Sequence, residues 1–251
     1  MSSKILIEVC CGSVDDAVMA ESGGAGRVEL NSSLFFGGLT PSLGSIIEAK
    51  RRLGIPVMVM IRPRGGGFCY TQAEMAVMLK DVELAIEHGA DGIVFGVLTQ
   101  AGSVDVKRCR QIIGLAKGKE AVFHRAFDVT PDPLETLDQL IELGFKRVLT
   151  SGQQRTVPEG AELIRKLIAH AAGRIEILPG GGIRPHNVRA VIEQTGTKQV
   201  HLSAFEQKID RSVHNRPHIT FGGALRPPED QYDVIDPSVI QSVSELLGDQ
   251  P

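Results

Sequence analysis

The sequence predicts a single-domain (β/α)8 barrel, the TIM barrel, spanning residues 1–251. Short apolar runs rich in β-branched residues alternate with helical patterns along the chain, which indicates a parallel sheet. Four times, a helix end and a glycine precede an apolar strand that starts at Val28, Ile93, Val148 or Val200. This fourfold repeat favours a closed barrel over an open sheet, and no shift in composition marks a domain boundary.

The remaining strands and the helices fall between these four strand starts. Apolar runs predict strands at 5–10, 57–61, 121–123 and 175–178. Helical patterns cover 13–22, 43–53, 71–88, 104–116, 131–143, 159–172, 185–195 and 237–247, with Ser13 and Thr71 as N-caps. The polar, proline-containing stretch of about 206–236 predicts a long loop before the last helix.

Composition excludes several classes of protein. The net charge is −3 and no basic stripe is present, which argues against a nucleic-acid partner. No run of about 18 apolar residues occurs, so we expect no contact with a membrane interior. The first residues lead into a strand and lack a signal-peptide pattern. We therefore expect a cytoplasmic protein whose four cysteines are reduced.

Charged side chains are predicted inside the barrel, near the C-terminal strand ends where barrel enzymes carry their sites. Side chains alternate along a strand, so the residues following the four strand starts face inward. With the same alternation in the other strands, the predicted polar lining is Glu8, Glu29, Arg62, His124 and His201, and Asp128 lies just past the fifth strand.

Two interpretations of this polar lining remain open. It is either a structural ion-pair cluster, mainly Glu8 and Glu29 with Arg62, or a site for acid–base chemistry. In the second interpretation the catalytic residues are those that can exchange protons: Glu8, Glu29, His124, Asp128 and His201. Arg62 then orients an anionic or hydroxylated substrate.

Loops at the same end add candidate substrate-binding residues. Gly181 and Gly182 follow the seventh strand, where backbone N–H groups bind phosphate in many barrels, although a tight turn also requires glycine. Arg64 lies beside three glycines and suits either an anion or a carboxylate of the protein itself. Ser203 points the same way as His201 and completes the set.

The cysteines lack the spacing of a zinc site. Soft thiolates suit Cu(I), and Cys10 and Cys11 at the end of the first strand are the candidate metal ligands, with Cys69 on a neighbouring loop. The alternative is that these residues are small buried hydrophobes.

The sequence resembles the CutC family of copper-homeostasis proteins over residues 4–204. The motifs that carry the resemblance are Glu8-Val9-Cys10, Arg27-Val28-Glu29-Leu30, the runs 37–42 and 56–66, Phe123-His124-Arg125-Ala126-Phe127-Asp128, the run 147–152, the glycines 180–182 and His201-x-Ser203-Ala204. The resemblance implies a barrel, a cytoplasmic location, a homo-oligomer of two or more copies and an association with copper tolerance. Carried over residue by residue, it covers Glu8, Cys10, Glu29, Arg62, Arg64, His124, Asp128 and His201.

Two departures from the family pattern bear on the function. Asn31 stands where members often carry a cysteine, and Gly67 stands where they often carry an aspartate. Two hypotheses remain for what the protein binds: a metal ion or a small molecule. In one, the protein binds copper as Cu(I); in the other, it is an acid–base enzyme acting on a small hydroxylated or anionic substrate, such as a glycoside.

Overall fold

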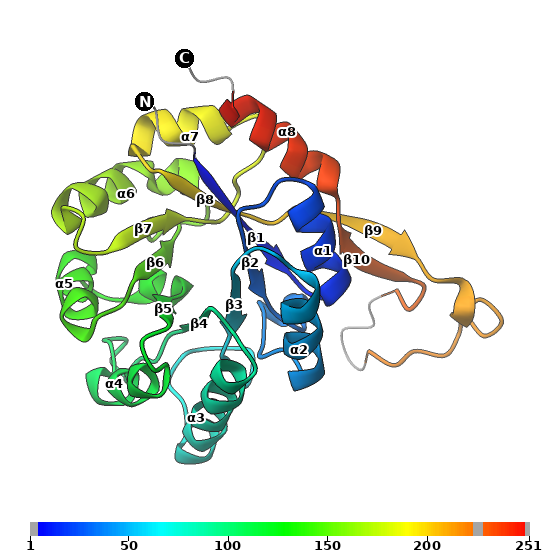
Figure 1. Cartoon of the computed structure of the whole chain (residues 1–251), viewed down its shortest axis with the longest axis horizontal. Coiled ribbons are helices and arrows are strands. Elements are labelled where there is room, and N and C mark those ends of the chain that lie inside the picture. The colour runs from blue at the N-terminus through cyan, green and yellow to red at the C-terminus, as the bar shows by residue number, and fades with distance from the viewer. Residues whose placement is uncertain (1–4, 223–227, 249–251) are drawn as a thin grey trace.

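The structure, a computed structural model, describes residues 5–222 and 228–248. Within them, eight parallel strands lie in the order β7-β6-β5-β4-β3-β2-β1-β8, and helices surround the strands (Figure 1). The sheet closes where Gly180, just past β7, forms a parallel bridge with His201 of β8. The predicted (β/α)8 barrel is confirmed.

The helices and strands follow the predicted order closely. The strands are β1 (Leu6–Cys11), β2 (Arg27–Leu30), β3 (Val57–Met60), β4 (Gly92–Phe95), β5 (Glu120–Phe123), β6 (Arg147–Thr150), β7 (Glu176–Pro179) and β8 (Gln199–Leu202). The helices are α1 (Val14–Ser22), α2 (Leu43–Arg52), α3 (Gln72–Glu87), α4 (Val106–Leu115), α5 (Pro133–Leu143), α6 (Val157–Ala171), α7 (Val188–Thr195) and α8 (Pro237–Gly248). None of the helices in the described ranges is long and apolar enough to cross a membrane.

Local chemistry explains where the helices start. Ser13 accepts a hydrogen bond from the backbone N–H of Asp16 at the start of α1. Thr71 and Glu74 form a capping box at the start of α3, in which each side chain bonds the other residue's backbone. Both predicted caps are confirmed.

The stretch predicted as a long loop is partly ordered as a β-ribbon. Strands β9 (Phe205–Ile209) and β10 (Gln231–Ile235) pair antiparallel and extend away from the barrel (Figure 1). Alternation of apolar and polar residues predicts a strand only when one face is buried, and most of this ribbon is exposed. The prediction of a long loop over about 206–236 was therefore wrong for these two segments.

The barrel has two separate apolar clusters, one between the strands and the helices and one inside the barrel. The outward residues of the strands pack with the helices in one large core, in which Val9, Val28 and Val200 are fully buried. A small cluster inside the barrel consists of Met58, Met60, Val94 and Val122. The predicted alternation is therefore confirmed in the strands that carry the polar candidates.

An ion-pair network fills the N-terminal end of the barrel. Arg147 is 2% exposed, and its guanidinium contacts Glu176 at 2.8 Å and Glu120 at 3.1 Å. Gln199 links this cluster to Arg27, whose Nη2 donates to the Gln199 amide oxygen at 2.8 Å. The two buried arginines, Arg147 and Arg27, are both partnered, as burial of charge requires, and they fix the lower layer of the barrel beneath the site.

Candidate metal and small-molecule site at the barrel mouth

A pocket of about 260 Å³ opens at the C-terminal end of the barrel. Strands β1, β2 and β8 meet beneath it, with Cys10 in register with Glu29 and Glu8 in register with His201. All four side chains point inward, so β1 supplies one acidic group deep in the barrel and one thiol a layer above it. The pocket lies where barrel proteins carry their functional groups.

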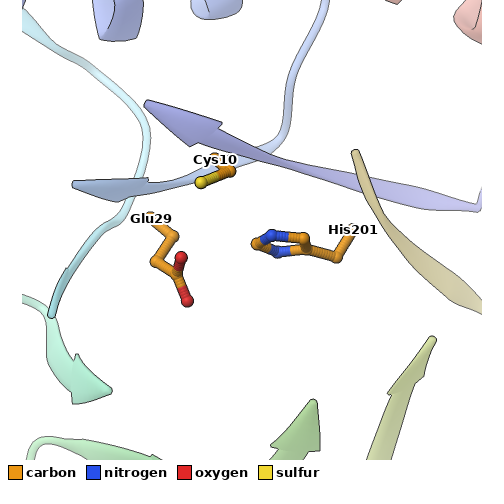
Figure 2. Close-up of side chains that lie close together, drawn as sticks. All are labelled: Cys10, Glu29 and His201. Carbon is orange, nitrogen blue, oxygen red and sulfur yellow. The ribbon is translucent and has the colours of Figure 1, made fainter. Parts of the chain in front are cut away.

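Cys10, Glu29 and His201 converge on one point of this pocket. Their ligand atoms, one from each residue, all lie within 4.8 Å of one another. Figure 2 shows the three side chains directed toward a shared space from three separate strands. A thiol, an imidazole and a carboxylate in this arrangement are a candidate metal site. Neither spacing nor motif revealed it, because the three residues are distant in the sequence.

Glu8 holds His201 in place from below. Its carboxylate accepts a hydrogen bond from Nδ1 of His201 at 2.8 Å and also pairs with Arg27. Burial alone would raise the pKa of Glu8, but the hydrogen bond from His201 and the positive charge of Arg27 outweigh it and lower the pKa to about 2. Glu8 is therefore ionised at neutral pH, and Nε2 of His201 is left free to face the pocket.

The three convergent groups hold their protons more tightly than usual. Burial and the negative charge of Glu29 raise the pKa of the Cys10 thiol well above its ordinary value. Burial also raises the pKa of Glu29, although the positive charge of His201 opposes it. Burial lowers the pKa of His201, but the hydrogen bond to Glu8 and the charge of Glu29 dominate, and the net shift is upward. A cation placed among them would displace these protons.

His124 lines another wall of the pocket and differs from His201. It caps the short 3-10 helix Arg125–Val129, where its Nδ1 accepts a hydrogen bond from the backbone N–H of Ala126 at 3.1 Å. Burial and the positive charge of Arg62 lower the pKa of His124 to about 3. Its Nε2 has no hydrogen-bond partner within the described part of the chain.

Arg62 lies in the pocket wall but does not pair with the inward carboxylates. Its Nη1 donates to the three main-chain carbonyls of 36–38 at 3.0–3.1 Å, and its Nη2 donates to the carbonyl of Gly66 at 2.8 Å. The guanidinium carbon lies 5.2 Å from the centre of the Phe68 ring. The predicted ion-pair cluster of Arg62 with Glu8 and Glu29 is therefore wrong, and Arg27 occupies that role for Glu8.

Asp128 lies outside the pocket and holds a loop together. Its carboxylate accepts hydrogen bonds from the backbone N–H groups of Ser151 and Gln153 at 3.1 Å, and from the hydroxyl of Thr150. Arg125, which does line the pocket, pairs with the same carboxylate at 2.8 Å. The structure therefore does not bring Asp128 together with the other candidate acids.

Arg64 also turns away from the pocket. Its guanidinium pairs with Glu74 at 2.6 Å and lies 5.1 Å from the centre of the Tyr70 ring. It donates as well to the main-chain carbonyls of Gly65, Gly67 and Cys69. Of the two roles left open for Arg64, the geometry matches the internal carboxylate partner.

The glycine loop after β7 forms a turn against α6. Gly181 and Gly182 have φ angles of +121° and +74°, which favour glycine, and the carbonyl of Gly181 accepts from the backbone N–H of Val157. Gly181 lines the pocket, whereas a side chain on Gly182 would meet Thr156 at 2.9 Å. Ser203 also lines the pocket, as predicted from its alternation with His201.

The four cysteines do not gather. Cys11 is fully buried on the helix side of β1, with its thiol 3.5 Å from the carbonyl of Val9. Cys69 is exposed on a loop and Cys109 is buried in α4. Only Cys10 among the described cysteines lines the pocket, so the structure does not bring Cys11 to the candidate metal site.

Some contributing residues were not among the sequence candidates. Arg27 pairs with Glu8 beneath the site, and Phe68 contacts both Arg62 and His124. The signal for Arg27 was present, since it lies two residues before Glu29 and therefore on the same face of β2. Phe68 lies on an irregular loop, where no periodicity indicates the direction of a side chain.

Comparisons with known proteins agree with this architecture. The sequence profile of the CutC family matches residues 5–206. A family protein CutC from Treponema denticola is 54% identical over 92% of this chain and 94% of its own length. The copper homeostasis protein cutC homolog of Mus musculus is 43% identical over 97% of this chain and 90% of its own length. The crystal structure of the putative copper homeostasis protein CutC from Streptococcus agalactiae, 40% identical, superposes with a TM-score of 0.76 over 78% of this chain and 97% of that one. The chain belongs to the CutC family.

Proposed function

We propose that this protein binds copper at the barrel mouth through Cys10, His201 and Glu29, and that it acts in copper homeostasis by this route. The observation that carries the proposal is the convergence of a thiol, an imidazole and a carboxylate within 4.8 Å in an accessible pocket. The names of the mouse and human relatives, copper homeostasis protein cutC homolog, support the choice of metal.

The donor set fits copper by its chemistry. Thiolate is the soft ligand that Cu(I) prefers, and imidazole also suits copper. Asn31 lies where a second thiol would stand: its Nδ2 is 3.5 Å from Sγ of Cys10 and 2.9 Å from a carboxylate oxygen of Glu29. The other carboxylate oxygen of Glu29 has no partner among the described residues. His201 thus supplies the second donor that suits copper, and the carboxylate of Glu29 supplies negative charge beside it.

Glu8 supports the same assignment as an outer partner. Metal-binding histidines commonly donate their second ring N–H to a carboxylate, which fixes the tautomer and strengthens the ligand. The bond between Nδ1 of His201 and Glu8 has this form, and it directs Nε2 toward Cys10 and Glu29. A purely structural ion pair would not need to leave the second ring nitrogen facing a pocket.

A cytoplasmic location and a homo-oligomer form part of the proposal. Cys10 must be a free thiol to bind copper, and the cytosol keeps thiols reduced. Exposed apolar side chains of the β9–β10 ribbon, Ile209 and Tyr232, suit contact with a second copy. Sedimentation equilibrium of the wild type and of a variant with Ile209→Ser and Tyr232→Ser tests that contact.

Cu(I) affinity under anaerobic conditions, measured by competition with a chromophoric chelator, tests the copper site. We expect one Cu(I) per chain, with the affinity reduced at least about a hundredfold by Cys10→Ser. Cys69→Ser is the matched control, because it removes an exposed thiol that lies outside the pocket. Equal affinity of the wild type and Cys10→Ser, or an equal loss in both variants, would overturn the proposal.

A further inference from the structure

His124 presents a hydrogen-bond donor that nothing in the described structure accepts. Its Nδ1 accepts the backbone N–H of Ala126, so Nδ1 carries no proton. The ring is neutral because burial and the charge of Arg62 lower its pKa to about 3. A neutral imidazole whose Nδ1 is an acceptor carries its one proton on Nε2. Nε2 is therefore an N–H group, and it is buried without a partner.

Packing fixes the orientation of this ring at the wall of the pocket. A Cβ on Gly96 would lie 2.6 Å from Cε1 and 2.7 Å from Nδ1 of His124, so that edge of the ring lies against the backbone of Gly96. Cδ2 lies opposite this edge and Nε2 lies between Cε1 and Cδ2, and His124 is among the residues that line the pocket. Phe68 packs against the ring at a tilt, with the two ring centres 4.8 Å apart.

Arg62, which also lines the pocket, carries a second donor without a partner in the part of the chain that the structure describes. Its two terminal nitrogens bond main-chain carbonyls, but its Nε has no partner among the described residues. No carboxylate of the described chain neutralises the charge of Arg62 or bonds His124. Two buried N–H donors without acceptors are costly unless a ligand satisfies them.

We propose that the pocket binds a small carboxylate whose oxygens accept hydrogen bonds from Nε2–H of His124 and Nε–H of Arg62. A planar anion with two acceptor oxygens matches two donors and one positive charge. The volume of about 260 Å³ admits only a small molecule, since pockets for drug-sized ligands measure roughly 300–1,000 Å³. The placement of this ligand beside copper rests on the proposed function, whereas its contact with His124 does not.

Isothermal titration calorimetry of the full-length protein with glycolate tests the carboxylate site. The titration is run on metal-free protein and again on copper-loaded protein. Two control ligands are titrated in the same way: ethylene glycol, which is uncharged, and inorganic phosphate, which is a different anion. We expect saturable glycolate binding in both forms and a loss of about tenfold to a hundredfold in His124→Asn. The asparagine can still cap Ala126, but it lacks a donor at the Nε2 position. His88→Asn, at the end of α3 and outside the pocket, is the control and keeps the wild-type affinity.

The tautomer of His124 in the wild type provides a test that does not depend on the variant folding. Nitrogen-15 chemical shifts of the imidazole should show a protonated Nε2 and an unprotonated Nδ1 at pH 7, and glycolate should shift the Nε2–H resonance. Several results would overturn the proposal: no glycolate binding, tighter binding of phosphate or ethylene glycol, an unchanged affinity in His124→Asn, or a proton on Nδ1. Glycolate binding without a Cys10-dependent Cu(I) site would instead overturn only the copper assignment.

Discussion

The buried ring of His124 makes the stability of the protein depend on pH in a defined direction. In the folded chain its pKa is about 3, whereas an unfolded histidine has a pKa of about 6.5. Between these values the unfolded state binds a proton that the folded state does not, so stability falls as pH falls below about 6.5. From pH 7.5 to 5.5 this costs about 1.4 kcal/mol.

Urea unfolding at those two pH values, for the wild type and His124→Asn, isolates this contribution. The variant lacks the ionisable ring, so the difference in the free energy of unfolding between wild type and variant should change by about 1.4 kcal/mol in favour of the variant at pH 5.5. A difference independent of pH would mean that His124 is protonated as readily in the folded protein as in the unfolded chain.

Glu8 provides a test of the copper site without changing a ligand. Glu8→Gln keeps the shape of the side chain but removes the negative charge that partners Nδ1 of His201. We expect the Cu(I) affinity to fall about tenfold to a hundredfold, as for other outer partners of metal-binding histidines. The control is Glu162→Gln, which removes an exposed carboxylate of α6 and should leave the affinity unchanged. An affinity equal to that of the wild type in Glu8→Gln would contradict the outer-partner role.

The alternation of side chains along the strands predicted which residues of the site point inward. It did not predict where the ends of long side chains lie. Glu8, Glu29 and His201 point inward as predicted, because a short strand leaves their direction no freedom. Arg62 begins on the expected face, but its long side chain reaches the carbonyls of 36–38 instead of the carboxylates. The distance between Cys10 and His201 depends on barrel closure, which residue spacing does not specify.

At the scale of elements, the junction of β6 and α6 shows how tightly backbone segments pack beside the site. A Cβ on Gly160, in the first turns of α6, would lie 2.0 Å from the backbone oxygen of Ser151 and 2.8 Å from Cα of Gly152. A Cβ on Gly114, in the exposed last turn of α4, would meet nothing within 4 Å. Both glycines lie in helices, but only Gly160 is required by close packing of the backbone, whereas Gly114 has room for a side chain.

This contrast predicts opposite effects of the same substitution. Gly160→Ala should lower the free energy of unfolding by about 1–3 kcal/mol, because overpacking against the backbone outweighs the helical preference of alanine. Gly114→Ala should raise it by about 0.5–1 kcal/mol, because only the helical preference acts. Chemical denaturation of both variants measures the two changes. Stabilisation by both substitutions would show that the β6–α6 junction can relax at little cost.

The helices could be predicted from the sequence more completely than the β9–β10 ribbon for a physical reason. The helices each bury one face, so the period of their apolar residues marks them, and Ser13 and Thr71 mark two of their starts. The ribbon buries Ile235 at its base, but residues 206–209 of β9 are exposed. The sequence of the ribbon therefore shows no regular alternation of apolar and polar residues that would predict a strand. Pairing between the two strands is visible only in three dimensions.

At the scale of the whole molecule, the candidate copper ligands bring the start and the end of the barrel's strand order together. Cys10 and Glu29 come from the first two strands and His201 from the last. Among the described strands, β7 and β8 are joined by the single bridge between Gly180 and His201, whereas the other neighbouring strands of the barrel pair through two to four residues each. A metal bound by these three side chains therefore ties β8 to β1 and β2 next to the weakest seam of the barrel.

Copper should accordingly stabilise the fold as a whole and protect β8 in particular, because β8 carries the ligand His201 beside this seam. At a free concentration 100 times the dissociation constant, the stabilisation is about 2.7 kcal/mol, which corresponds to a rise of about 5–10 °C in Tm for a chain of this size. Thermal unfolding with buffered Cu(I) measures the rise, and hydrogen exchange should show added protection at residues 199–202. Cys10→Ser should show neither effect. An equal rise in Tm in Cys10→Ser would place the bound copper elsewhere, because the variant lacks the thiol of the proposed site.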